Sequence, residues 1–329
     1  MFFYPRPYLL ALRIIIWRRI KIHYLSLSMV EQYVERYPTG TTRPALSLFC
    51  LFGVPFSTSK IFPVLWTLSI GGAVSPVVYS VEGNVATITL DDKENRNALG
   101  NALTAGIYQS LNTAMDDASV RAIVLTHEGT VFCAGANLKE RSAQNSDVDE
   151  DGVGFDQVLS LIQTCPKPVI AKISGAAMGG GIGLACAADI SIATEDAKFG
   201  FTEVRLGVAP AIISVVCLSR MRRGEAMEAF LRGNKFSGKE AANLGIVSRA
   251  VHADDLETEI QSILDDVLRG GPMALAAAKR LINEIPEKPV DEAFTWAADF
   301  SSALFNSEEA AEGMAAFLEK RDARWVIDE

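Results

Sequence analysis

The chain has 329 residues, of which 49% are hydrophobic, and its 40 acidic against 31 basic side chains give a net charge of −9. This length and apolar content allow a large buried core and exclude general disorder. A net negative chain lacks the concentrated basic surface that phosphate binding needs, so we expect no nucleic acid partner.

The N-terminal segment, residues 1–76, differs in charge from the rest of the chain. It holds eight basic and two acidic residues, a net +6, whereas residues 77–329 carry −15. Three interpretations stay open for it: a cleaved presequence, translation from a non-native upstream start, and a membrane anchor. Its apolar runs are short or broken by Pro and charged residues, so we expect no stable membrane insertion. We treat it as an extension outside the fold.

The chain then begins with strand signals. VVYSVE and VATITL, residues 77–82 and 85–90, are β-rich runs joined by a short turn, which predicts an antiparallel hairpin. In residues 99–117 an apolar side chain recurs every four positions, at Leu103, Ile107, Leu111 and Met115. This spacing predicts an amphipathic helix. The apolar run RAIVLTH, residues 121–127, predicts a buried strand.

The pattern repeats in a looser form. PVIAKIS (168–174) and DISIAT (189–194) are predicted strands, and the small-residue stretch between them, 175–188, predicts a helix entered through glycines and no strand. From about Ala211 onward we expect almost only helices, the last of them with Asn306 as N-cap and Glu309 in a capping box. Strands with interleaved helices, followed by a helical tail, predict the α/β class.

Several common kinds of site lack their motifs. The three histidines are far apart and the five cysteines include no CxxC pair, so we expect no metal and reduced, packed thiols. The sequence contains no GxxxxGK[ST], GxGxxG or GxSxG. These absences argue against a nucleotide triphosphatase, a dinucleotide-binding fold and an α/β-hydrolase.

Two small-residue loops follow predicted strands: FCAGAN (132–137) and MGGG (178–181). Small residues let a ligand approach the main chain, and N–H groups from two loops could form an oxyanion hole, although both loops could also be plain tight turns. Glu203 stands among apolar residues, where burial would raise its pKa and suit it to proton transfer. Pairing with Arg205 or helix capping is the structural alternative for this carboxylate.

Residues 77–325 resemble the crotonase superfamily, the enoyl-CoA hydratase/isomerase enzymes. The similarity lies, in family order, in ENRNAL, GTVFCAGANLKE, PKPVIAKISGAAMGGGIGLACAADI, AKFGFTEVRLGVAP and SEEAAEGMAAFLEKR. The resemblance implies an α/β crotonase-like spiral of repeated ββα units over residues 77–270. It also implies a C-terminal helical region, 271–329, that mediates homotrimers or hexamers formed as dimers of trimers.

The resemblance further implies an acyl-CoA thioester as substrate, with no separate cofactor. Carried over by position, it makes the N–H groups of Ala134 and Gly180 the oxyanion donors. It assigns the CoA thioester site to Ala134, Gly135, Ala136, Asn137 and Gly180, with Asn137 in place of the usual Asp. The best-known hydratases use two glutamates, and the corresponding positions here are Gly183 and Glu203. Only Glu203 can therefore act as an acid or base.

We therefore expect an enoyl-CoA hydratase, a hydro-lyase that adds water to a trans-2-enoyl-CoA to give the 3-hydroxyacyl-CoA, as in fatty acid β-oxidation. Because one carboxylate also suits a 1,3-proton shift, a Δ3,Δ2-enoyl-CoA isomerase is the alternative. A non-catalytic acyl-CoA-binding protein is the third interpretation. We expect a cytoplasmic location, or the mitochondrial matrix if residues 1–76 are a cleaved presequence.

Overall fold

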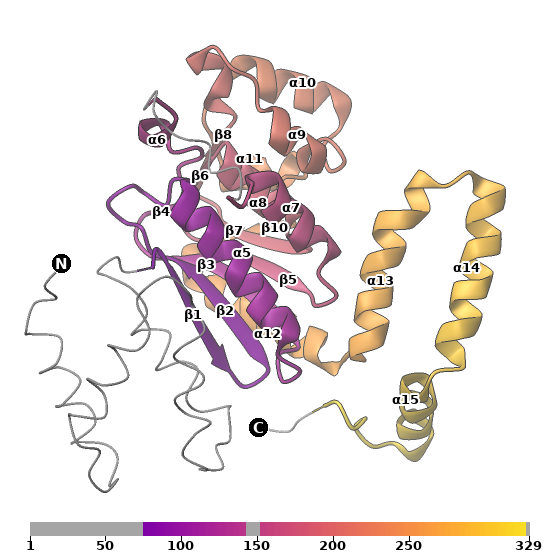
Figure 1. Ribbon diagram of the computed structural model, residues 1–329. Coiled ribbons are helices and arrows are strands. Elements are labelled where there is room, and N and C mark those ends of the chain that lie inside the picture. The colour runs from indigo at the N-terminus through magenta and orange to yellow at the C-terminus, as the bar shows by residue number, and fades with distance from the viewer. Residues whose placement is uncertain (1–74, 143–151, 327–329) are drawn as a thin grey trace, which may run out of the picture. The chain divides into compact units, whose positions relative to one another are not determined.

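The computed structural model describes residues 75–142 and 152–326 (Figure 1). Contacts divide the chain into two units, Met1–Gly72 and Ala73–Glu329, and all described residues belong to the second. The predictions for residues 1–76 therefore fall outside the described residues, except at Ser75 and Pro76. In the described part, no helix combines the length and the apolar character needed to cross a membrane.

The strands form two sheets. The six-stranded sheet contains, in spatial order, β1 (Val77–Glu82), β2 (Val85–Leu90), β3 (Ala122–His127), β5 (Val169–Ile173), β7 (Ile190–Thr194) and β10 (Arg249–Val251). The four-stranded sheet contains β4 (Val131–Cys133), β6 (Ala176–Met178), β8 (Lys198–Gly200) and β9 (Phe236–Ser237). Pairing is parallel except between β1 and β2 and between β8 and β9.

Helices separate the successive strand pairs. They are α5 (Asn101–Asp116), α6 (Leu138–Ser142), α7 (Phe155–Thr164), α8 (Gly180–Ala187), α9 (Ala211–Cys217), α10 (Arg223–Arg232), α11 (Gly238–Asn243), α12 (Leu256–Arg269), α13 (Pro272–Glu284), α14 (Val290–Phe305) and α15 (Glu308–Glu319). Short 3-10 helices span Thr202–Leu206 (η2), Ala253–Asp255 (η3) and Ile285–Glu287 (η4). The pairs β3–β4, β5–β6 and β7–β8 each place one strand in each sheet before a helix follows, which is the expected crotonase-like succession of ββα units.

The central strand β3 is buried on both faces. Ile123 and Leu125 belong to the main core, and the alternating residues Ala122 and Val124 belong to a second apolar cluster against α12. Successive side chains of a strand point to opposite faces, so a strand covered on both sides needs a continuous apolar run. This explains why RAIVLTH could be recognised from its sequence.

The hairpin, the helix at α5 and the strands β3, β5 and β7 confirm the predictions. One expectation was wrong, because Ala176–Met178 is strand β6. The region after Ala211 is mostly helical, as expected, and the short strands β9 and β10 interrupt it. These strands have two or three residues, and β6 pairs with β4 and β8 on its two sides. Pairing with neighbours therefore decides their conformation more than the intrinsic preference of Ala and Met.

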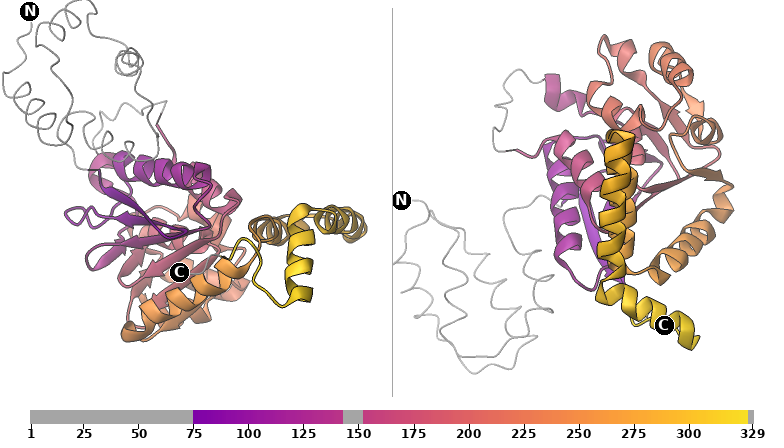
Figure 2. Two further views of the ribbon diagram at one scale, coloured as in Figure 1. Left: turned by 90° about the horizontal axis from the view of Figure 1, so that it is seen from below. Right: turned by 90° about the vertical axis from the view of Figure 1, so that its right-hand side faces the viewer.

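The C-terminal helices α13, α14 and α15 project from the sheets on one side (Figures 1 and 2). Lys279 of α13 joins them to the core, because its Nζ lies 2.8 Å from Asp189 Oδ2 and 2.7 Å from the Ile162 carbonyl oxygen. Arg121 makes a second connection by donating to the carbonyls of Gly270 and Trp325. No residue of α14 is buried within this chain.

The cap of α15 corrects a sequence prediction. Ser307, not Asn306, is the N-cap, and its hydroxyl accepts a hydrogen bond from the Ala310 N–H at 3.1 Å. The Glu309 carboxylate accepts instead from the N–H groups of Met273 and Ala274 in the first turn of α13, at 2.9 and 2.8 Å. The acidic side chain therefore caps a neighbouring helix, where its charge also favours the helix dipole.

Candidate active site

The loop between β2 and α5 supports the candidate site. Asn97 is fully buried, and its amide accepts from the Asp92 N–H at 2.7 Å and donates to the Val131 carbonyl at 2.8 Å. Arg96 and Asn97 both have left-handed backbones, with φ of 54° and 52°. This conformation directs the Arg96 carbonyl to the Ala134 N–H, at 3.1 Å. The ENRNAL motif thus holds the end of β4 in place.

Leu99 fixes the FCAGAN loop from the same side. Its N–H donates to the Gly135 carbonyl at 2.7 Å, and its carbonyl accepts from the Asn137 N–H at 3.2 Å. Gly135 has φ +88°, and a Cβ built on it would lie 3.1 Å from the Met178 carbonyl oxygen and 3.6 Å from the Gly180 nitrogen. The two loops singled out in the sequence are therefore adjacent, and glycine at 135 supplies both the positive φ and the room for this approach.

The hydrogen bond from Ala134 to Arg96 does not fit the predicted role of Ala134. Its N–H already has an acceptor in the protein and cannot also serve as a free oxyanion donor. The Ala136 N–H, by contrast, has no hydrogen-bond acceptor among the described residues, and Ala136 is exposed. The backbone of Leu99 forms hydrogen bonds with Gly135 and Asn137, the two neighbours of Ala136, and leaves the Ala136 N–H unbonded. The available donor in this loop is Ala136.

Asn137 has a local structural task. Its Oδ1 accepts from the N–H groups of Lys139 and Glu140 at 3.2 and 3.4 Å, at the start of α6, and its Nδ2 donates to Glu140 Oε1 at 2.7 Å. Asn and Asp are both effective residues at a helix N-terminus. The replacement of the usual Asp by Asn137 therefore preserves this capping geometry.

The second loop leads into α8. Gly179 has φ 49° and ψ −110°, which only glycine adopts readily, and α8 begins at Gly180. The first N–H groups of a helix have no intrahelical acceptor, and they lie at its positive end. No acceptor for the Gly180 N–H is present among the described residues. Gly180 therefore has the free donor that its predicted role requires.

Glu203 lies beside this helix start. Its Oε1 is 2.7 Å from the position that a Cβ on Gly179 would take, so a side chain there would collide with the carboxylate. Its Oε2 is buried and has no hydrogen-bond partner among the described residues. Burial, which disfavours the charged form, raises the pKa of the Glu203 carboxyl. Among the described residues Glu203 forms no ion pair with Arg205, the structural alternative considered for this residue.

Gly183, the position of the missing second glutamate, faces α9. A Cβ at Gly183 would overlap Ile213 Cγ2 and lie 3.1 Å from Ile213 Cβ and 3.6 Å from Phe155 Cε1. An apolar side chain therefore fills the space into which a residue at this position would extend. Among the described residues close to Gly180, Glu203 is the carboxylate available for proton transfer.

Other chemical groups give no competing site. Burial raises the pKa of the Cys133 thiol to about 12, so it stays protonated and unreactive near neutrality. Within residues 75–142 and 152–326, no group of three or more His, Cys, Asp or Glu side chains could hold a metal ion.

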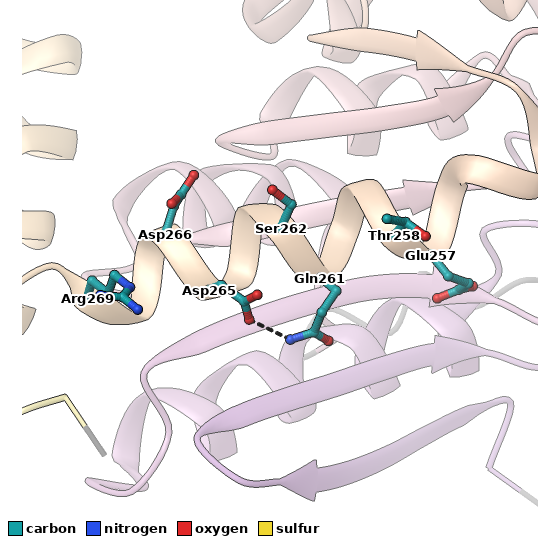
Figure 3. Close-up of a pocket in the computed structure, with 7 residues that line it drawn as sticks. All are labelled: Glu257, Thr258, Gln261, Ser262, Asp265, Asp266 and Arg269. Atoms are coloured by element: carbon teal, nitrogen blue, oxygen red, sulfur yellow. Dashed lines mark hydrogen bonds between the residues drawn. The ribbon is translucent and has the colours of Figure 1, made fainter. Parts of the chain in front are cut away.

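Surface depressions also lie away from Glu203. Figure 3 shows one along α12, whose lining residues all come from the exposed face of that helix: Glu257, Thr258, Gln261, Ser262, Asp265, Asp266 and Arg269. Gln261 and Asp265 bond to each other at 2.7 Å. This face is the polar side of an amphipathic helix whose apolar side covers the six-stranded sheet.

Two sheets linked by ββα units, free N–H groups at the start of α8 and a half-buried carboxylate beside them define an α/β enzyme of the crotonase fold. Enoyl-CoA hydratase/isomerase is the family whose profile matches residues 80–327. The chain belongs to this family.

Individual relatives agree with this assignment. The chain is 30% identical over 257 residues to the crotonyl-CoA hydratase of Syntrophomonas wolfei, covering 77% of this chain and 99% of that protein. It is 29% identical over 248 residues to the short-chain-enoyl-CoA hydratase of Clostridium acetobutylicum, covering 74% and 95%. The crystal structure of an enoyl-CoA hydratase/isomerase from Marinobacter aquaeolei superposes with a TM-score of 0.71 at 31% identity, covering 77% of this chain and all of that one.

The sequence missed three features of this site. Ala136 has the same residue type as Ala134 and lies in the same loop. Only the hydrogen bond from the Ala134 N–H to the Arg96 carbonyl distinguishes the two candidate donors. Leu99 and Ile213 come from segments far from the glycine-rich loops and carry no local signal of their position. The apolar side chains around Gly183 could be identified only once α8 and α9 were placed against each other.

Proposed function

We propose that this protein is an enoyl-CoA hydratase that converts a trans-2-enoyl-CoA to the 3-hydroxyacyl-CoA. The observation that carries the proposal is the half-buried Glu203 side chain, whose carboxylate has a buried, unpartnered oxygen and lies against Gly179 at the start of α8. The names of the relatives support hydration as the reaction, and the two named above act on crotonyl-CoA and short-chain enoyl-CoA.

In the proposed mechanism, the N–H groups of Ala136 and Gly180 donate to the thioester carbonyl oxygen. These fixed donors stabilise the negative charge that develops on this oxygen as C3 is attacked. Ala136 replaces Ala134 in this role because the Ala134 N–H is bonded to Arg96. Gly135, in the loop that contains Ala136, allows this loop to approach Met178 and Gly180 and so keeps the two donors close to each other.

Glu203 acts twice in this reaction. Its carboxylate removes a proton from water while the water oxygen forms a bond to C3, and the C2–C3 π electrons move into the thioester enolate. The carboxylic acid then returns the proton to C2 as the carbonyl is restored. A raised pKa brings the acid and base forms closer in population near neutral pH, which suits a group that must both accept and donate.

A specific observation also favours the second candidate, a Δ3,Δ2-enoyl-CoA isomerase. Ile213 occupies the space beside Gly183, so no second carboxylate can position a water there. In this reaction Glu203 would remove a proton from C2 of a 3-enoyl-CoA, and the same proton would return at C4 of the dienolate. The two N–H donors would stabilise the dienolate oxygen in the same way.

The test is product analysis by mass spectrometry after the full chain is incubated separately with a trans-2-enoyl-CoA and a 3-enoyl-CoA. A hydratase adds the mass of one water to the first substrate. Conversion of the second at unchanged mass, without hydration of the first, identifies the isomerase instead. Binding of both thioesters without turnover would leave the third interpretation, an acyl-CoA-binding protein.

Glu203→Gln serves as the control in the same assay. Loss of a general acid or base lowers rates by about 10²- to 10⁴-fold. We expect this loss in the variant, with thioester affinity changed little, because the amide has the size of the carboxyl group. Full activity in Glu203→Gln would contradict the mechanism.

We further propose that the protein needs no cofactor besides the CoA of its substrate and that it forms homotrimers or dimers of trimers. Large apolar side chains exposed on the C-terminal helices support the assembly, among them Phe294, Phe305 and Phe317 at 74%, 68% and 84% exposure. Monomeric proteins rarely expose such residues in number. A cytoplasmic location, with the mitochondrial matrix as the alternative, is also a proposal, and the N-terminal sequence of the native protein tests it.

A further inference from the structure

Helices α8 and α9 are in close contact at Gly183. A Cβ there would overlap Ile213 Cγ2, and Ile213 itself is only 4% exposed. Its neighbours in α9, Ile212 and Val215, are exposed, at 45% and 75%. Ile213 therefore points from α9 toward α8, and glycine at 183 is what allows the two helices to approach so closely.

Ile213 and two further apolar side chains form a wall along α8 that extends toward the proposed oxyanion donors. Phe155, at the start of α7, has its Cε1 3.6 Å from the Cβ position of Gly183 and 3.4 Å from that of Gly180. Leu99 Cδ1 would overlap a Cβ on Gly180. Leu99, Phe155 and Ile213 thus border the stretch of α8 that runs from the Gly180 N–H to Gly183.

This stretch is short. Gly183 follows Gly180 by three residues, and one helical turn rises about 5.4 Å. An acyl chain whose thioester carbonyl is bound at the Gly180 N–H, and which extends along α8, therefore reaches Phe155 and Ile213 within about one turn. Well-packed side chains resist displacement, so Phe155 and Ile213 limit how far the acyl chain can extend along α8.

We infer that Ile213, with Phe155, limits the length of the acyl site along α8 and restricts the substrate to short acyl groups. This inference rests on the proposed binding of acyl-CoA, and it assigns the specificity to a residue outside the proton-transfer machinery. Ile213 contacts the acyl chain in this assignment and takes no part in moving a proton.

The test compares the dissociation constants of saturated butanoyl-CoA and octanoyl-CoA, measured calorimetrically on the full chain. In a hydrophobic pocket, one methylene changes discrimination by about tenfold or more. We expect the native protein to prefer butanoyl-CoA by at least about tenfold. Ile213→Ala should reduce this preference at least about fivefold, mainly by improving octanoyl-CoA binding.

Val216→Ala is the matched control, because Val216 is also buried on α9, at 2% exposure, whereas the atoms nearest to the Cβ position of Gly183 belong to Ile213 and Phe155. It should lose stability without changing the ratio of the two constants. Should Ile213→Ala fail to fold, Ile213→Val removes a single methyl group and should shift the ratio in the same direction by a smaller factor.

A second measurement tests the steric relation itself. Gly183→Ala should weaken butanoyl-CoA binding, and adding Ile213→Ala should restore it by making room for the new methyl group. The inference would be overturned if both Ile213 variants bind butanoyl-CoA and keep the native ratio of the butanoyl-CoA and octanoyl-CoA dissociation constants. This outcome would leave the proposed function intact. Failure of the native protein to bind either thioester would overturn both.

Discussion

Burial raises the pKa of two carboxyl groups in the described residues, Asp189 and Glu203, but their surroundings differ. Asp189 accepts a hydrogen bond from the Val169 N–H at 2.7 Å and pairs with Lys279 at 2.8 Å. Glu203 has a buried oxygen without a partner. A buried carboxylate with its bonds satisfied is typical of a structural role, whereas one left unsatisfied beside free N–H groups is typical of a reactive site.

Glu203→Gln should therefore stabilise the protein near neutral pH. The folded pKa of Glu203 lies above its ordinary value of 4.5, so its favourable contribution exists at low pH and is lost as the pH rises through the folded pKa. Glutamine does not titrate. We expect the variant to raise the Tm by about 2 °C or more at pH 7 and by less at pH 4, measured by scanning calorimetry.

Glu82→Gln, on the exposed end of β1, is the control for this measurement and should leave the Tm nearly unchanged at both pH values. An increase for Glu203→Gln that is equal at pH 4 and pH 7 would show that charge burial is not its cause.

At the residue scale, the sequence predicted what depends on neighbours in the chain. Glu203 was singled out because apolar residues surround it in the sequence, which predicted that its carboxyl group would be removed from solvent. The assignment of Ala136 and not Ala134 as oxyanion donor depends on which N–H group donates to the Arg96 carbonyl, and Arg96 belongs to another loop. No pattern within FCAGAN could decide this.

At the scale of elements, the loop between β2 and α5 has a locally unfavourable backbone conformation. Arg96 and Asn97 both have the left-handed backbone, which costs about 1–2 kcal/mol for a residue with a side chain. The buried Asn97 side chain offsets this cost through its bonds to Asp92 and Val131. The loop in turn fixes the strand end that leads to the oxyanion donors.

Asn97→Ala should lower the free energy of unfolding by about 3 kcal/mol, because it leaves buried backbone groups at Asp92 and Val131 without partners. Asn97→Gly loses the same bonds but relieves the backbone, so it should cost about 1 kcal/mol less. Urea denaturation measures both. Equal losses in the two variants would show that the left-handed backbone contributes nothing, and a loss below about 0.5 kcal/mol would contradict the role of the side chain.

The elements that the sequence predicted correctly are those with a local pattern. The spacing of Leu103, Ile107, Leu111 and Met115 was sufficient for α5, and the continuous apolar run was sufficient for β3. Strand β6 was missed because its conformation comes from pairing on both edges. The Asn306 cap was wrong because Glu309, its expected partner, binds the start of α13 instead.

At the scale of the whole described unit, the site is a product of the alternation between the two sheets. ENRNAL follows β2, FCAGAN begins in β4 and continues past its end, and the glycines of α8 follow β6, so three separate turns of the spiral deliver backbone groups to one place. Glu203 arrives from η2, directly after β8. Sequence resemblance anticipated this convergence, but residue patterns alone could not, because each segment is locally an ordinary turn.

The C-terminal helices extend the same reasoning to assembly. Phe294 of α14 and Phe317 of α15 are 74% and 84% exposed, and burying one such side chain stabilises an interface by about 1.5–3 kcal/mol. Phe294→Glu combined with Phe317→Glu should therefore dissociate the proposed trimer into monomers, as measured by analytical ultracentrifugation. Ser301→Glu adds charge to an exposed position of α14 and should leave the trimer intact. Persistence of the trimer in the double variant, or its loss in the serine control, would show that these aromatic side chains do not form the interface.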